Sequence, residues 1–163
     1  MGLLDKAKSF MGQHGLRVEL TSLERQDPKT CKFPMSDTVL KGKYNVTADK
    51  DCVVLNHQHF FILEKKHPDG FLERVTLGQD RHDDTTQIMG SALRWPYPLA
   101  ANQSQEDGFL ISDIDVGGAL RKLGYEPERA VLKAEIRFFV RVLADVKGSP
   151  FDPTHEVNVT VVP

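Results

Sequence analysis

The chain of 163 residues has little of what small secreted or membrane proteins depend on. Its only cysteines, Cys31 and Cys52, do not have the spacing of a zinc site, and the start of the chain lacks the pattern of a secretory signal. We therefore expect reduced thiols in a cytoplasmic protein. No apolar run is long enough to cross a membrane. The formal net charge of −2 argues against nucleic-acid binding, which needs clustered positive charge.

Common catalytic motifs are missing as well. Ser91 does not lie in the Gly-x-Ser-x-Gly turn of a hydrolase, and neither cysteine has the surroundings of an activated thiolate. Gly117 and Gly118 form an isolated pair rather than a phosphate-binding loop. These absences predict a protein that is not an enzyme and uses no cofactor.

What the sequence does contain is alternation of apolar and polar residues with a period of two, which is typical of strands with one buried face. The pattern runs over residues 16–23, with a slip near its end, and over 40–48, where Gly42 suggests a bulge or a close approach of the backbone. A strand over 53–66 and a second one over 71–79 are joined by His67-Pro-Asp-Gly70, a strong turn signal, and are predicted to form a hairpin.

The clearest alternation runs from residue 130 to 146. Apolar residues from Leu132 to Val146 lie on one predicted face and charged residues on the other, which predicts a long antiparallel strand. The tail over 155–162 is its expected hairpin partner. Several strands, tight turns and few helices predict an all-β protein, an antiparallel β-sandwich of the immunoglobulin-like kind.

A short amphipathic helix is predicted over residues 1–15, followed by the β-sandwich domain over 16–163. Leu3, Phe10 and Met11 are on its apolar side. Membrane contact through this helix is an alternative, but an interfacial helix usually has a longer basic face. We therefore expect the helix to contact its own domain.

Two parts of the chain resemble the arrestin-like β-sandwiches, and among them the bacterial sporulation-control arrestin-like family. One is the long strand with its hairpin and tail, and the other is the segment from Thr38 to Lys66. The resemblance covers about two thirds of the chain; Gly42, Tyr44 and Val46 stand where the early strand of such a lobe has its glycine and aromatic residue. It implies an arrestin-like fold and a non-catalytic role. Full arrestins have two lobes, and this chain has the length of one. The segment FPMSDTVLKG departs from the usual start of the early strand, so no phosphate-sensing or binding residue is transferred.

The leading functional prediction is a protein-interaction or scaffold module. Loops and strand edges held by two sheets offer a docking surface for a protein partner or for a second copy of the chain. Aromatic side chains dominate interface energetics, so Trp95, Tyr97 and Phe151 are the candidate contact residues. Packing in the core or against loops is the alternative for each of them.

The rival prediction is a metal-dependent enzyme or a metal-binding sensor. His57 and His59 are two residues apart on a predicted strand, so their imidazoles lie on the same face. Three or four converging ligands are needed, and the segment from Asp80 to Asp84 offers the others. A polar strip on the solvent side of the strand is the simpler alternative. The candidate ligands are His57, His59, His82 and Asp84, with Asp80 and Asp83 as further choices.

Overall fold

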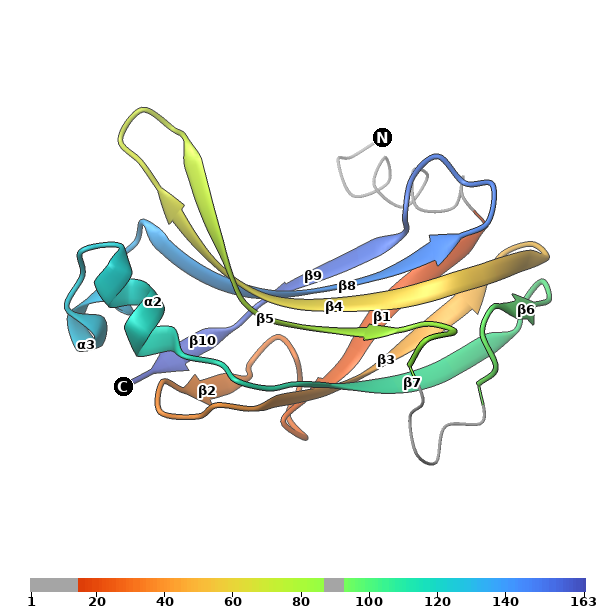
Figure 1. The fold of residues 1–163 in the computed structure, drawn as a ribbon, viewed down its shortest axis with the longest axis horizontal. Coiled ribbons are helices and arrows are strands. Elements are labelled where there is room, and N and C mark those ends of the chain that lie inside the picture. Colours follow the sequence, from red (N-terminus) through yellow and green to blue (C-terminus); the bar gives the residue numbers. More distant parts are fainter. Residues whose placement is uncertain (1–14, 87–92) are drawn as a thin grey trace.

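The alternating segments form two antiparallel sheets that face each other, as the computed structural model of the chain shows for residues 15–86 and 93–163 (Figure 1). The predicted antiparallel β-sandwich is confirmed. The predicted N-terminal helix lies outside the described residues. The described strands are β1 (Leu16–Leu23), β2 (Lys32–Pro34), β3 (Leu40–Ala48), β4 (Cys52–Lys66), β5 (Leu72–His82), β6 (Tyr97–Leu99), β7 (Ser104–Ile111), β8 (Ile136–Val146), β9 (Thr154–Asn158) and β10 (Thr160–Val162).

One layer of the sandwich contains β1, β3 and β7 in that order, and the other contains β5, β4, β8 and β9, with β6 pairing along the start of β4. A short parallel pair of β10 with β2 lies at the end where the chain finishes (Figure 1). The slip expected near the end of β1 is a register shift between Leu20 and Ser22. Gly42 makes the predicted close approach, because a Cβ there would collide with the ring of Phe109.

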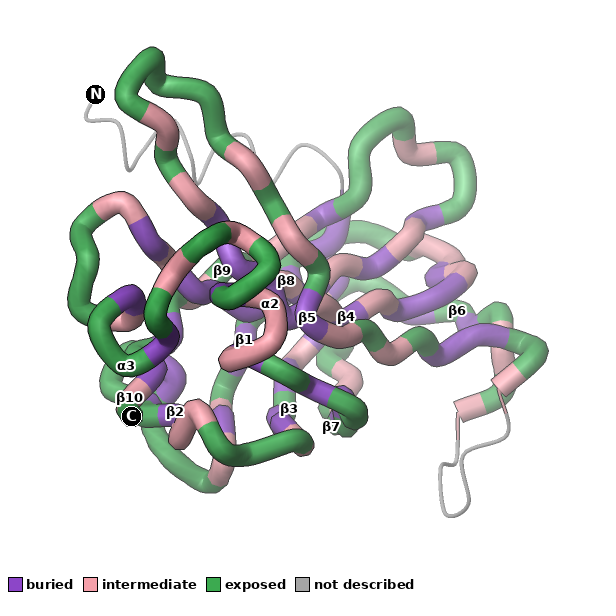
Figure 2. The backbone as a smooth tube through the Cα atoms, turned by 60° about the vertical axis from the view of Figure 1, so that its left-hand side comes forward, coloured by how far each residue is buried: buried purple, intermediate pink, exposed green. Residues whose placement is uncertain are grey.

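The predicted hairpin between β4 and β5 is present. Gly70 adopts a positive φ of 89°, and its N–H donates to the carbonyl of His67 at 2.9 Å, so the turn uses the freedom that glycine provides. The outer half of this hairpin rises away from the other sheet (Figure 1). Figure 2 shows that its tip is exposed.

Two predicted boundaries near the C-terminus were wrong. The strand expected from residue 130 begins at Ile136, because Pro127 starts a short helix, α3 (Pro127–Ala130). Turns follow this helix as far as Ile136, whose N–H donates to the carbonyl of Lys133. Leu132 is 81% exposed instead of facing the core. The tail pairs with β8 only as far as Asn158, and Thr160–Val162 then pairs with β2.

Side chains close the open edges between the two layers. On one side, the backbone N–H of Leu20 in β1 donates to Nδ1 of His155 in β9 at 2.9 Å. On the other, the N–H of Leu110 in β7 donates to Oδ2 of Asp80 in β5 at 3.3 Å. Gly78 permits the close approach of β5 and β7, since a Cβ there would collide with Ile111.

A second described helix, α2 (Val116–Lys122), begins at Asp115, whose Oδ1 accepts a hydrogen bond from the N–H of Gly118 at 2.8 Å. This N-cap gives the carboxylate of Asp115 a structural role. Among the described residues, no helix has the length and apolar character required to span a membrane.

Candidate functional site

Titratable side chains gather inside one half of the sandwich, where the hairpin of β4 and β5 faces β3 and β7. The register of the hairpin pairs His57 with His82 and His59 with Asp80. Because side chains alternate along each strand, all four lie on the inner face. We call this group the buried polar cluster; its members are Tyr44, His57, His59, Asp80, His82, Tyr97 and Asp107.

The hydroxyl of Tyr44, which is fully buried, is the centre of the cluster. It lies 2.6 Å from Nδ1 of His57, 2.8 Å from Nε2 of His59 and 3.1 Å from Oδ2 of Asp107. The hydroxyl of Tyr44 donates its single proton to the carboxylate of Asp107, which can only accept. Both histidines then donate to the oxygen of Tyr44, and Nε2 of His57 accepts from the hydroxyl of Tyr97 at 2.7 Å.

His82 bridges the two carboxylates of the cluster. Its Nδ1 lies 2.9 Å from Oδ2 of Asp107 and its Nε2 lies 3.0 Å from Oδ2 of Asp80. Burial alone lowers the pKa of His82, but the two carboxylates outweigh burial and raise it to about 9. Burial raises the pKa of each carboxyl group, yet the neighbouring histidines keep both pKa values well below the usual range. Without a bound metal, an imidazolium therefore lies between two carboxylates.

The other two histidines are neutral. Burial lowers the pKa of both His57 and His59, and neither side chain is exposed. His59 donates through Nε2 to Tyr44, which leaves a lone pair on Nδ1. That atom has no hydrogen-bond partner among the described residues, although Oδ2 of Asp80 is 3.5 Å away. A buried acceptor without a donor is costly.

Aromatic rings enclose the cluster. The ring of His59 stacks on Phe109 with centroids 4.9 Å apart, and Trp95 meets the edge of His57 at 4.7 Å. Phe109 in turn lies against Gly42. These rings lower the local polarity and fix the orientation of the imidazoles.

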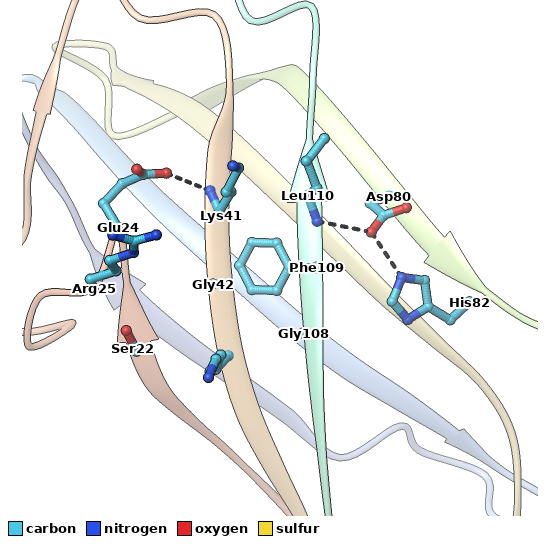
Figure 3. A pocket seen from close by; sticks show the side chains of 11 residues that line it. Ser22, Glu24, Arg25, Lys41, Gly42, Asp80, His82, Gly108, Phe109 and Leu110 are labelled. Atoms are coloured by element: carbon cyan, nitrogen blue, oxygen red, sulfur yellow. Dashed lines mark hydrogen bonds and ion pairs between the residues drawn. The ribbon is translucent and has the colours of Figure 1, made fainter. Parts of the chain in front are cut away.

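The cluster reaches the surface at a groove of about 880 Å³ that lies over β3 and β7 beside β5. Figure 3 shows Asp80 between His82 and Leu110, with the ring of Phe109 beside them. The groove also has cationic side chains on its wall, namely Arg25, Lys41 and Lys43. A solvent molecule or a small anion can therefore approach Asp80 and His82 from outside.

The structure brings together three of the four candidate metal ligands. His57, His59 and His82 meet in the cluster, and Asp80 joins them, whereas Asp84 is exposed beyond the end of β5 and belongs to neither group of converging ligand atoms. The alternative of a polar strip on the solvent side was wrong, because both strand histidines face the interior. Sequence reasoning missed Tyr44 and Asp107 as members.

The candidate contact residues have different surroundings. Tyr97 is only 6% exposed and belongs to the cluster, so its side chain is not a surface contact. Trp95 is partly buried against His57 and Tyr97. Phe151 is 58% exposed in the loop between β8 and β9. Only Phe151 therefore has the exposure expected of a docking residue.

A second surface feature is the outer edge of β5. In the described part of the chain, this strand pairs with β4 alone. The N–H of His67 donates to the carbonyl of Phe71 at 2.8 Å, so these two residues form a hydrogen-bonded pair of the β4–β5 ladder. Hydrogen-bonded and non-hydrogen-bonded pairs alternate along an antiparallel ladder. The backbone groups of Leu72, Arg74 and Thr76 therefore point away from β4. We call residues Leu72–Thr76 the β5 edge. Leu72 within this edge is 42% exposed, and Phe71 beside it is 63% exposed.

Comparison with known proteins gives the fold. No protein-family model matches the chain, and no curated protein matches its sequence. Among solved structures, the chain is similar to Spo0M, the sporulation control protein from Bacillus subtilis, with a TM-score of 0.61 and 9% sequence identity. The match covers 91% of this chain and 50% of that one, so the chain spans about half the length of Spo0M. The expected arrestin-like β-sandwich is confirmed.

Proposed function

We propose that the protein is a non-catalytic interaction module that binds an extended peptide segment of a protein partner along the β5 edge. The observation that carries the proposal is the row of outward backbone groups at Leu72, Arg74 and Thr76, which have no strand partner in residues 15–86 and 93–163. An added strand pairs with such groups through main-chain hydrogen bonds, and nearby side chains give specificity.

The surroundings of the β5 edge support this use. Phe71 and Leu72 offer apolar surface to the side chains of an added strand. The hairpin extends away from the second sheet (Figure 1), so a peptide can approach its outer edge. A cytoplasmic location fits the free thiols of Cys31 and Cys52.

The proposal is tested by removing one outward N–H. Peptides are selected from a random displayed library against the wild-type protein, and the dissociation constant of the best synthetic peptide is measured for Arg74→Pro. Proline takes away a donor that points into solvent and leaves the ladder with β4 intact. We expect the dissociation constant to rise by about tenfold, because one main-chain hydrogen bond to the peptide is lost.

Two matched variants separate this effect from others. Arg74→Ala removes the ion pair between Nε of Arg74 and Glu64, 2.7 Å long, but keeps the N–H, and should change affinity less than about threefold. Glu156→Pro makes the same change on β9, at the opposite edge of the sheet. Equal binding by Arg74→Pro and the wild type contradicts the proposal. If Arg74→Pro instead abolishes a dimer measured by light scattering, the occupant of the edge is a second copy.

A further inference from the structure

We propose that the buried polar cluster is a binding site for a first-row divalent cation such as Zn²⁺, held by Nδ1 of His59, Oδ2 of Asp80 and Nε2 of His82. This inference goes beyond the interaction function and does not depend on it, because the site and the β5 edge use different residues. It rests on the unpartnered nitrogen of His59, the convergence of three ligand atoms, their outer contacts and the groove.

The unpartnered nitrogen is the first indication. The proton assignment at Tyr44 leaves a lone pair on Nδ1 of His59, which has no hydrogen-bond partner among the described residues. A carboxylate oxygen, Oδ2 of Asp80, lies 3.5 Å away. Two electron-rich atoms at this separation, in a buried place, attract a cation between them.

Three ligand atoms converge at that place. Nδ1 of His59, Oδ2 of Asp80 and Nε2 of His82 all lie within 4.8 Å of one another, and the two contacts of Asp80 measure 3.5 Å and 3.0 Å. Nitrogen and oxygen ligands at about 2.0–2.2 Å from a tetrahedral zinc are about 3.3–3.5 Å apart. Small shifts of these side chains are therefore enough to hold the ion.

Each ligand is also oriented from behind. The second nitrogen of His59 donates to Tyr44, and the second nitrogen of His82 lies 2.9 Å from Asp107. The free oxygen of Asp80, Oδ1, accepts from the N–H of Arg81 at 2.9 Å. Outer contacts of this kind fix ring orientation and raise ligand basicity in metal sites. Asp107 additionally supplies a second negative charge that balances a divalent ion.

A second group of three atoms is less suitable. Nδ1 of His57, Nδ1 of His82 and Oδ2 of Asp107 also converge. Both nitrogens of His57, however, already have tyrosine partners, at 2.6 Å and 2.7 Å. An ion there would displace the bonds of both tyrosines to His57. An ion at His59 replaces the proton on Nε2 of His82 and its bond to Asp80, and it gives a partner to an atom that has none.

The groove supplies access and a fourth position. Asp80, with a side chain that is 25% exposed, and His82 line the groove of about 880 Å³. Two histidines and one carboxylate leave a coordination position for water or an outside ligand. Lys41 and Lys43 on the same wall favour an anionic one.

The experiment measures Zn²⁺ binding by calorimetry, with protein that has no polyhistidine tag and has been stripped of metal by a chelator. We expect one ion per wild-type chain. Asp80→Asn keeps the shape of the side chain and His59→Phe keeps a ring against Phe109, and each should weaken binding by about a hundredfold or more, since a ligand atom is lost. His67→Ala, at a residue outside the cluster, should bind within about threefold of the wild type.

His67 is the control for casual surface binding, because its Nε2 also lies beside a carboxylate, that of Glu73, at 2.7 Å. A wild-type measurement covers the case in which a variant does not fold: ¹⁵N resonances of the histidine rings, recorded during Zn²⁺ addition, should shift at Nδ1 of His59 and Nε2 of His82. Absence of an equimolar site, retained binding in both ligand variants, or a shift at Nδ1 of His57 instead would overturn the proposal.

Discussion

The inner face of β4 changes character halfway along its length. His57 and His59 occupy the half near β6, and Phe61 and Leu63 occupy the half toward the hairpin, yet all four side chains are fully buried. The apolar half needs only complementary shapes, such as the edge of Phe33 against Phe61 at 5.3 Å between centroids. The polar half needs a donor or acceptor for each nitrogen, and β3, β5, β6 and β7 supply partners for all of them except Nδ1 of His59.

This difference separates the fold from a site within it. Apolar residues at all of these positions would fold equally well, since a buried ionic group replaced by apolar residues of similar volume is often neutral or stabilising. The fold therefore does not require a cluster of three histidines, two tyrosines and two carboxylates, and buried titratable groups of this kind are concentrated at functional sites. The difference also predicts that the two halves of β4 respond differently to substitution.

The largest effect is expected in the apolar half. Phe61→Ala removes a fully buried ring that contacts Phe33 and Phe138, and we expect the free energy of unfolding to fall by about 3–5 kcal/mol, because a cavity remains. Denaturant unfolding measures it. Phe71→Ala, at a side chain that is 63% exposed, is the matched control and should change stability by under about 0.5 kcal/mol. Similar losses in the two variants would show that Phe61 is not part of the core.

A smaller effect is expected in the polar half. Tyr44→Phe keeps the ring but removes the hydroxyl shared by His57, His59 and Asp107, and should lower the free energy of unfolding by about 2–3 kcal/mol. Tyr97→Phe removes the partner of His57 alone and should cost about 1 kcal/mol. The same denaturant series measures both. A larger loss in Tyr97→Phe than in Tyr44→Phe would contradict the central position of Tyr44.

Alternation in the sequence predicted most of this architecture but not the cluster. The strands over 40–48 and 53–66 and the hairpin turn at Gly70 were predicted correctly, since period, turn residues and length agree there. The pattern failed from Val131 to Glu135, where alternating residues lie in turns, because an exposed segment can alternate without being a strand. Parallel pairing of β10 with β2 joins the tail to residue 32, a contact that local sequence cannot indicate.

The sequence signal for the site was a spacing of two residues between polar side chains, which occurs on both strands of one predicted hairpin. His57 and His59 face the same way, as do Asp80 and His82, and the hairpin sets the pairs opposite each other. Asp84 was a wrong choice because β5 ends at His82. Asp107 gave no such signal, because it lies on β7, outside the hairpin, and only the fold brings it to His82.

The smallest expected effect concerns a histidine outside the cluster. Burial lowers the pKa of His155, whose neutral Nδ1 accepts from the N–H of Leu20. The unfolded chain has the ordinary pKa near 6.5 and therefore binds more protons at mildly acidic pH. The stabilisation is thus complete above about pH 6.5 and is lost as the pH falls through the lower pKa of the folded state.

His155→Asn isolates this contribution, because its Oδ1 can accept from Leu20 without titrating. The free energy of unfolding is measured at pH 7.5 and at pH 5.0 in both proteins. The decrease on acidification should be larger in the wild type than in the variant. The excess should be under about 1 kcal/mol, the size of one hydrogen bond. The buried histidines of the cluster are present in both proteins and cancel in the comparison. Equal pH dependence in the two proteins would mean that the link between β1 and β9 does not depend on the proton of His155.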